Sequence, residues 1–307
     1  MSPVIESRRV AVILNTAAGA EKEGALRGRL TEIFAQHNIK CDIHLIGLGD
    51  GITKIAQAAA REGNFAVVAG GGDGTVSAVA SALLNTECAL GVLPVGTLNH
   101  FAKDLGIPLD AEKAAETIAT GGIRQVDVGE VNGKIFVNNS SLGLYPNMVR
   151  GRDHEQRLGR SKWMAFLWAV FAVVRRYPLL GVRLTSDDGR QITRRTPVVF
   201  IGNNKYQLNG FEIGTRLSLD QGKLAVYVAH HNGRLGLIRI GIESVLGRLH
   251  RGADFDFLSA DELQIETAQR KIQVAADGEV STFIPPLIYR IHPLALRVIV
   301  PIVPAAK

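Results

Sequence analysis

A run of glycines interrupted by one carboxylate constrains this chain more than any other feature. The segment VVAGGGDGTVSAVASALL (67–84) leads from an apolar strand into a helix of small residues through GGGDGT (70–75). Glycine loses more conformational freedom on folding than any other residue, so four glycines at one corner are costly unless space is needed there. A backbone without Cβ atoms lets an anion approach the amides at the helix start, and Asp73 fits there beside a cation on a polyphosphate. The segment indicates a nucleotide kinase, with a merely tight turn as the alternative.

The first 128 residues alternate between strand-like and helix-like patterns. Strands are expected at 9–14, 41–46, 65–70 and 90–96, and helices at 25–37, 51–62, 75–84 and 110–120. Short apolar runs separated by helices of this length are typical of βαβ units. We therefore expect an α/β domain with a mainly parallel sheet over residues 1–128.

The pattern changes near residue 123, where hairpin signals begin. Two strands over 124–143 are expected to join at Asn132-Gly133, and a second hairpin surrounds Asp188-Gly189. Further strands are expected at 222–230 and 270–280 with a last one at 294–303, and helices at 157–176 and 235–249. Residues 129–307 are thus predicted to form a mostly antiparallel β domain, although the last strand, 294–303, could return to the first domain.

Two further corners accompany the glycine run. The segment GVLPVGTLNHFAKDLGIP (91–108) ends a strand at Gly96-Thr97 and begins a helix at Asn99, and a weaker corner after the first strand carries Asn15 and Gly19. Ligands of parallel sheets bind beyond the carboxyl ends of the strands, so the corners are expected to line one crevice. A simple helix cap at Thr97 or Asn99 is compatible with that interpretation.

The net charge indicates the class of partner, and the cysteine content indicates the compartment. A net charge of +6 and a pI near 9.4 favour an acidic partner such as polyphosphate or anionic lipid. Aromatic residues make up 6% of the chain and no nucleic-acid motif is recognisable, so nucleic acid is not expected as a partner. Two cysteines form no disulfide framework and no secretory signal is apparent, so a cytoplasmic protein is expected.

Four segments in this order resemble the diacylglycerol kinase catalytic-domain family, which includes sphingosine kinases and bacterial lipid kinases. They are GGGDGT (70–75), PVGTLNHFA (94–102), VDVG (126–129) and ADGE (276–279). NAD kinases and phosphofructokinases share a related glycine signature, whereas the Gly-Thr-x-Asn corner and a β-rich half with Asp-Gly-Glu favour the lipid-kinase branch. The resemblance spans the whole chain and implies an α/β ATP-binding domain, a β-sandwich domain, and ATP and lipid meeting in the cleft between them.

The resemblance also implies roles for individual residues. Glu279 would be the general base that takes the proton of the lipid hydroxyl, Asp127 would support the metal-phosphate network, and Asp73 would act beside the phosphates. ATP with Mg²⁺ would be the cofactor. The residues implied in nucleotide binding are Asn15, Gly19, Gly71, Gly72, Asp73, Gly74, Thr75, Val76, Ser77, Gly96, Thr97 and Asn99. Turn chemistry alone would also explain the ADGE segment.

Several positions depart from the family pattern. The first loop is Asn-Thr-Ala-Ala-Gly (15–19) in place of Asn-Pro-x-Ser-Gly, and Ser77-Ala78 replace an Asn-Glu pair. His100 stands where the family has an acid, and Gln221 where it commonly has a metal-binding Asp. Mg²⁺ prefers anionic oxygen ligands, so metal binding is weakened unless Asp220, one residue away, substitutes.

The segment KWMAFLWAVFAVVRRYP (162–178) suggests contact with lipid. Twelve consecutive apolar residues lie between cations, too few to span a bilayer, which takes about 20. An apolar helix beside clustered cations fits docking at the inner face of a membrane, and a core helix is the alternative. We expect a peripheral protein that takes a lipid substrate at the membrane surface, and leave open a homodimer.

The leading hypothesis is an ATP-dependent kinase of a diacylglycerol- or sphingoid-like lipid. A soluble NAD-kinase-like enzyme is the alternative enzyme. A non-catalytic nucleotide- or lipid-binding regulator is the alternative from another class, motivated by His100 and Gln221.

Overall fold

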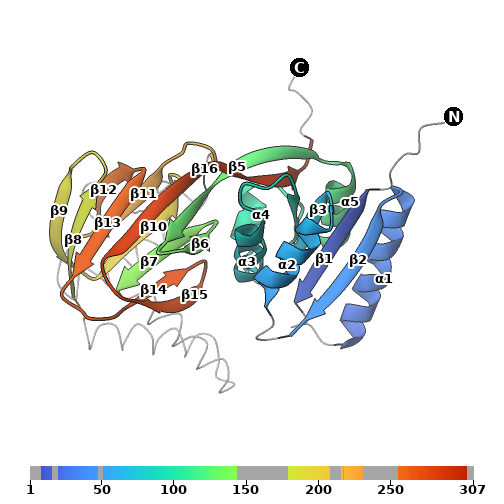
Figure 1. Ribbon diagram of the computed structural model, residues 1–307, viewed down its shortest axis with the longest axis horizontal. Helices are drawn as coiled ribbons and strands as arrows, with labels where there is room; N and C mark the ends of the chain where they lie inside the picture. The colour runs from blue at the N-terminus through green and yellow to red at the C-terminus, as the bar shows by residue number, and fades with distance from the viewer. Residues whose placement is uncertain are drawn as a thin grey trace. The chain divides into compact units, whose positions relative to one another are not determined.

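The computed structural model describes residues 8–15, 20–47, 51–143, 179–207, 216, 218–230 and 255–302, the side chains of 20–23 excepted. The expected helices at 157–176 and 235–249, and Gly19, lie outside these residues. The chain divides into two compact units, Met1–Val126 with Leu294–Lys307, and Asp127–Pro293 (Figure 1). None of the described helices has the length and apolarity needed to cross a bilayer.

The first unit contains a parallel sheet in the order β2-β1-β3-β4-β16. Its strands are β1 (Arg9–Asn15), β2 (Lys40–Ile46), β3 (Ala66–Gly70), β4 (Ala89–Leu93) and the end of β16 (Leu287–Val300). Its helices are α1 (Ala20–Gln36), α2 (Ile52–Arg61), α3 (Asp73–Leu83), α4 (His100–Asp104) and α5 (Ala111–Thr120). The mainly parallel sheet predicted from the sequence is confirmed.

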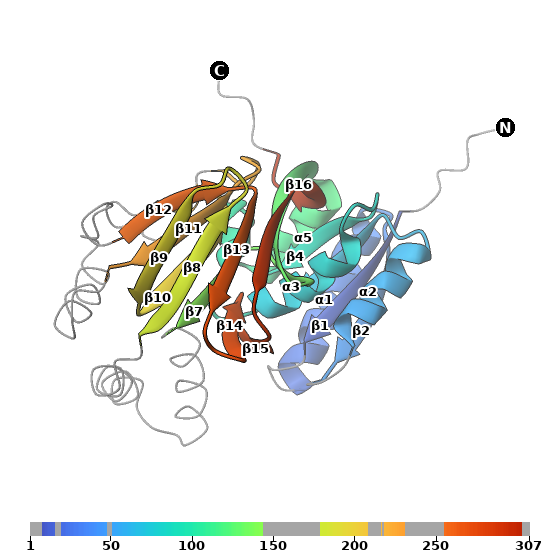
Figure 2. The ribbon, with the colours of Figure 1, turned by 60° about the vertical axis from the view of Figure 1, so that its left-hand side comes forward.

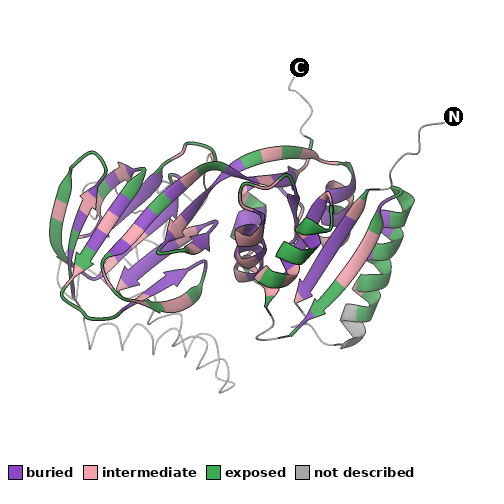
Figure 3. Ribbon diagram, viewed as in Figure 1, coloured by how far each residue is buried: buried purple, intermediate pink, exposed green. Residues whose placement is uncertain are grey.

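The strands β3 and β4, and residues 10–14 of β1, are apolar without interruption because helices cover both faces of the sheet there. Helices α1 and α5 pack together, as do α2 and α3, and each pair contacts the sheet (Figure 1). All five residues of β3 and all five of β4 are buried, whereas the outer surface of α1 is exposed (Figure 3). Strands buried on both faces carry continuous runs of aliphatic residues, which is the pattern seen here.

The second unit is a β-sandwich. One sheet, β12-β11-β10-β7-β14-β15, is antiparallel throughout, and β16, β13, β8 and β9 form an antiparallel run opposite it (Figure 2). The strands are β7 (Asn139–Gly143), β8 (Leu180–Ser186), β9 (Gln191–Thr196), β10 (Val198–Asn203), β11 (Leu224–Ala229), β12 (Phe255–Ala260), β13 (Glu262–Thr267), β14 (Ile272–Ala276) and β15 (Glu279–Phe283). Inward side chains of both sheets form a single apolar cluster, so the predicted antiparallel β-sandwich is confirmed.

A buried tyrosine joins the two sheets of the sandwich. Tyr289 of β16 has no exposed surface, packs edge-to-face on Phe136, and has its hydroxyl 3.1 Å from Ser140 Oγ of β7. Burial raises the pKa of Tyr289 well above its ordinary value. The hydroxyl therefore stays protonated, and its one polar contact is satisfied inside the core.

The segment 124–143 forms three strands, and not the two that the sequence predicts. The hairpin of β5 (Gly122–Val131) and β6 (Lys134–Phe136) turns at Asn132 (φ 45°) and Gly133 (φ 84°), which is the expected site. The chain then leaves this pairing, and β7 joins the other sheet. The Asp277 carboxylate accepts the backbone N–H groups of residues 137–139 at 2.6–3.0 Å, and it thereby occupies the donors that would have continued the hairpin.

Both cysteines of the first unit are poorly ionised. Burial raises the pKa of the Cys41 thiol to about 12, with the neighbouring Asp42 charge adding to the effect, and burial raises that of Cys88 to about 11. Thiolate is the nucleophile, so at pH 8 iodoacetamide should alkylate both at least ~100-fold more slowly in the folded than in the unfolded protein. Peptide-resolved mass spectrometry measures the two rates, with guanidinium-denatured protein as the control. A native rate within about tenfold of the denatured one would contradict this ionisation state.

Candidate nucleotide and acceptor sites

Three strand-to-helix corners meet at the carboxyl ends of β1, β3 and β4 in the first unit. Asn15, the last residue of β1, donates from Nδ2 to Thr75 Oγ1 of α3 at 3.4 Å. The backbones after β3 and β4 also touch, since a Cβ atom on Gly96 would lie 2.3 Å from Gly72 Cα. Glycine at 96 is therefore required for the close approach of the two corners.

The amino end of α3 is open to an anion. Gly72 is the N-cap of this 11-residue helix, and as glycine it has no side chain to accept the first helix amides. A Cβ atom on Gly72 would meet only Gly96 Cα, at 3.8 Å. The first amides of a helix carry partial positive charge and need acceptors. The corner thus offers both the space and the donors that a phosphate group uses.

The other predicted nucleotide-binding residues divide between this corner and the core. Gly71 is packed against Thr75, whose Oγ1 lies 2.4 Å from a Cβ atom built on Gly71, so this glycine serves internal packing. The side chains of Val76 and Ser77 are buried, at 3% and 9% exposure. Thr97 is exposed on the second corner, and Gly74 belongs to the first turn of α3.

Asp73 ties the two corners together. Its carboxylate accepts the backbone N–H groups of His100 at 3.4 Å and Phe101 at 3.3 Å, at the start of α4. Asn99 begins α4 in the left-handed conformation (φ 51°) and donates from Nδ2 to the carbonyls of Pro94 and Gly96, both at 2.9 Å. Its Oδ1 is buried and has no hydrogen-bond partner among the described residues.

Asp127 of β5 has no exposed surface and anchors a loop of the second unit. Its Oδ2 accepts from Gly222 N at 2.6 Å and from Asn204 Nδ2 at 3.0 Å, and its own N–H donates to Leu219 O at 2.7 Å. A buried carboxylate needs such donors. In the structure, Asp127 holds the 218–223 loop in place. Its role near phosphates stays a prediction.

Asp220 is the exposed acid of that loop. Its Oδ1 accepts from Ser218 Oγ, and the neighbouring Gln221 N donates to Asn204 Oδ1 at 3.2 Å. No set of three or more His, Cys, Asp or Glu side chains within the described ranges is arranged to hold a metal ion. The carboxylates of Asp73, Asp127 and Asp220 each accept protein donors, and a role of Asp220 in binding Mg²⁺ stays a prediction.

Glu279 begins β15 directly after a tight turn. Asp277 (φ 46°) and Gly278 (φ 83°) form that turn, and the Asp277 side chain, 7% exposed, holds it to the 137–139 backbone. The Glu279 side chain is 61% exposed, with Oε2 3.2 Å from Lys134 Nζ. An exposed carboxylate on a rigid turn can accept a proton from a bound hydroxyl group.

The sequence analysis did not single out three residues of this region, which are Arg216, Asp277 and Lys134. Arg216, 5% exposed, donates to Val137 O at 2.7 Å and to Asn138 Oδ1 at 2.8 Å, so the 137–139 segment lies between a buried guanidinium and the Asp277 carboxylate. Lys134 contacts the Glu279 carboxylate. The ADG turn was a signal for Asp277, whereas the sequence gives no signal for Arg216 or Lys134.

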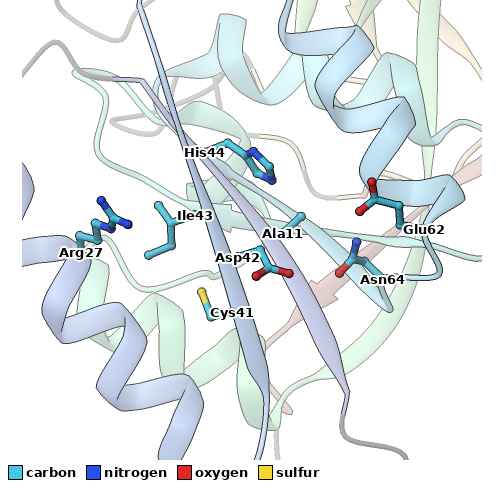
Figure 4. Close-up of a pocket in the computed structure, with 8 residues that line it drawn as sticks. All are labelled: Ala11, Arg27, Cys41, Asp42, Ile43, His44, Glu62 and Asn64. Atoms are coloured by element: carbon cyan, nitrogen blue, oxygen red, sulfur yellow. The ribbon is translucent and has the colours of Figure 1, made fainter.

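A cavity of about 430 Å³ lies elsewhere, at the edge strand β2 of the first unit. Figure 4 shows Asp42 and His44 on the side of β2 that faces Glu62 and Asn64, and Arg27 on the other side. The cavity is lined by Ala11, Arg27, Cys41, Asp42, Ile43, His44, Glu62 and Asn64. None of the residues predicted from the sequence to bind nucleotide belongs to it.

Two family models match this chain. Residues 9–131 match the diacylglycerol kinase catalytic domain, and residues 146–300, which are more than half of the chain, match the YegS C-terminal NAD kinase beta sandwich-like domain. The chain belongs to the diacylglycerol kinase catalytic-domain family. The resemblance drawn from the four segments is thereby confirmed.

Individual members of the family are distant in sequence. A diacylglycerol kinase of Bacillus subtilis (strain 168) is 25% identical over 282 residues, which cover 91% of this chain and 92% of the relative. A Chromohalobacter salexigens protein named "Probable lipid kinase YegS-like" is 28% identical over 261 residues, covering 82% and 80%. The crystal structure of a diacylglycerol kinase from Bacillus anthracis superimposes with a TM-score of 0.69 at 20% identity, covering 96% of this chain and 97% of that one, which shows the shared fold.

Proposed function

We propose that this protein is a lipid kinase that transfers the γ-phosphoryl group of ATP to a hydroxyl of a diacylglycerol- or sphingoid-like lipid. The observation that carries the proposal is the uncapped, glycine-lined start of α3 beside the second corner. This arrangement offers backbone donors and dipole to phosphate oxygens. Family membership and the names of the relatives support the lipid as acceptor.

The reaction uses few protein groups. The lipid hydroxyl oxygen forms a bond to the γ-phosphorus of ATP, the bond between that phosphorus and the β–γ bridging oxygen breaks, and ADP leaves. Glu279 accepts the hydroxyl proton, and the amides at the start of α3 hold the phosphates that do not move. Mg²⁺ belongs to the proposal as the counter-ion that ATP phosphates carry, where it neutralises charge. Phosphoryl transfer depends on such positioning and charge stabilisation.

Two features support action at a membrane surface. The lipid acceptor resides in a bilayer, and the net charge of +6 attracts the protein to anionic head groups. The proposed location is therefore the cytoplasmic face of the inner membrane.

An acceptor panel tests the proposal. Purified protein is incubated with γ-³²P-ATP and mixed micelles of diacylglycerol, sphingosine or monoacylglycerol, with NAD in detergent-free buffer as the soluble acceptor, and products are separated by thin-layer chromatography. We expect label in one lipid product and none in NADP. Label in NADP alone would favour the NAD-kinase-like alternative. Tight ATP binding with no labelled product would favour the non-catalytic regulator, and either result overturns the proposal.

A further inference from the structure

The Glu279 side chain is held by a lysine from a distant part of the chain. Lys134 is the first residue of β6, and its Nζ lies 3.2 Å from Glu279 Oε2 and 2.9 Å from Ser281 Oγ. Glu279 and Ser281 are two residues apart in β15, so both side chains lie on the same face of that strand. The ammonium group therefore bridges two neighbours along one face.

The lysine is the more tightly placed partner of this ion pair. Its side chain is 28% exposed, against 61% for Glu279. The hydrogen bond to Ser281 fixes the ammonium group independently of Glu279. Glu279 contacts this lysine through Oε2, and within the described part of the chain no partner is found for its Oε1. The arrangement leaves one carboxylate oxygen directed by Lys134 and the other available to accept a proton.

The backbone beneath Glu279 is fixed in the same region. Asp277 holds the turn to residues 137–139, which follow β6. The segment 134–139 thus contacts both the side chain of Glu279, through Lys134, and the turn that presents it. A carboxylate on an exposed strand end would otherwise sample several rotamers, and only some would point its oxygen at an acceptor hydroxyl.

We propose that Lys134 is a positioning residue for Glu279, holding its carboxylate in one orientation for proton transfer. This inference depends on the proposed function, in which Glu279 is the base. Lys134 acts through Glu279 and makes no contact with the reacting atoms in this scheme. Loss of Lys134 is therefore expected to change kcat and not the affinity for nucleotide.

A double-mutant cycle tests the inference. We expect Lys134→Met to lower kcat about tenfold with little change in the KM for ATP, because orientation of the base matters in the transition state and not in ATP binding. Lys134→Arg, which keeps a cation of sufficient length, should recover a large part of that loss. In a Glu279→Ala background, Lys134→Met should have no further effect, since its target is absent.

The control is Arg290→Met, which removes another cation–carboxylate pair of the same unit, with Glu262, whose two side chains are 53% and 48% exposed. It should leave kcat unchanged. Melting temperatures identify any variant that loses activity because it does not fold. If Lys134→Met is such a variant, Ser281→Ala replaces it, since this change removes only the hydrogen bond between Ser281 and Lys134. We expect a loss of about twofold to threefold in kcat for Ser281→Ala.

Three outcomes overturn the inference. They are an unchanged kcat in both Lys134→Met and Ser281→Ala, an equal loss in the Glu279→Ala background, and a loss confined to the KM for ATP. An unchanged kcat in Glu279→Ala alone is a different result, because it removes the base from the proposed function whatever Lys134 does.

Discussion

Replacing Glu279 by alanine is expected to lower kcat about 10²- to 10⁴-fold while ATP binding is retained, because a positioned general base contributes a factor of this size. The side chain is 61% exposed, so truncation leaves no cavity in the sandwich. The turn that carries it is held by Asp277 and not by Glu279 itself. The melting temperature should therefore stay close to that of the parent protein.

Steady-state kinetics with the preferred lipid, together with calorimetric ATP titration, measure both parts of this prediction. Glu266→Ala is the matched control, since Glu266 is also an exposed strand carboxylate paired with a cation, Arg183. It should keep full turnover. If Glu279→Ala retains parental kcat, another group accepts the proton.

Gly72→Asp is expected to abolish measurable transfer, at least a 100-fold loss, without unfolding the protein. The new side chain has room, because a Cβ atom at 72 meets only Gly96 Cα at 3.8 Å. Gly72 has extended backbone (φ −85°, ψ −177°) at the N-cap of α3, where an aspartate oxygen accepts the helix amides. The carboxylate would occupy the donors that phosphate needs and would also repel it.

This substitution separates ligand binding from folding. A good N-cap adds about 1 kcal/mol to helix stability, so the melting temperature of Gly72→Asp should be unchanged or higher while ATP affinity is lost. Gly72→Ala adds only a methyl group and should keep most of the activity. Gly96→Ala is the control for a substitution that has no room, because the Cβ atom of the alanine would lie 2.3 Å from Gly72 Cα. This variant should have a lower melting temperature. Undiminished ATP binding by Gly72→Asp would show that phosphate binds elsewhere.

The parallel sheet and its corners could be predicted because local signals determine them. Apolar runs specify strands buried on both faces, and the glycines at 72 and 96 mark where two backbones approach. The role of Asp73 could not be predicted in the same way. Its carboxylate accepts amides 27 and 28 residues away, at the start of a five-residue helix.

The errors in the second unit arise from contacts between residues distant in sequence. The break between β6 and β7 depends on Asp277, about 140 residues later. The strands β12 and β13 were not predicted, although in β13 Leu263 and Ile265 alternate with polar residues. Lys134 reads as an ordinary solvated residue of a hairpin until its partner, 145 residues away, is placed beside it.

The strand that completes the parallel sheet comes from the far end of the polypeptide. Val298 of β16 pairs with Leu90 of β4, Ala295 O accepts from Asn85 N, and Leu296 and Val298 are fully buried. During synthesis the first 126 residues leave the ribosome with one edge of β4 unpaired until residues 294–300 have been translated. Completion of the first unit thus depends on synthesis of β16, so a polypeptide that stops before residue 294 cannot assemble that unit in its native form.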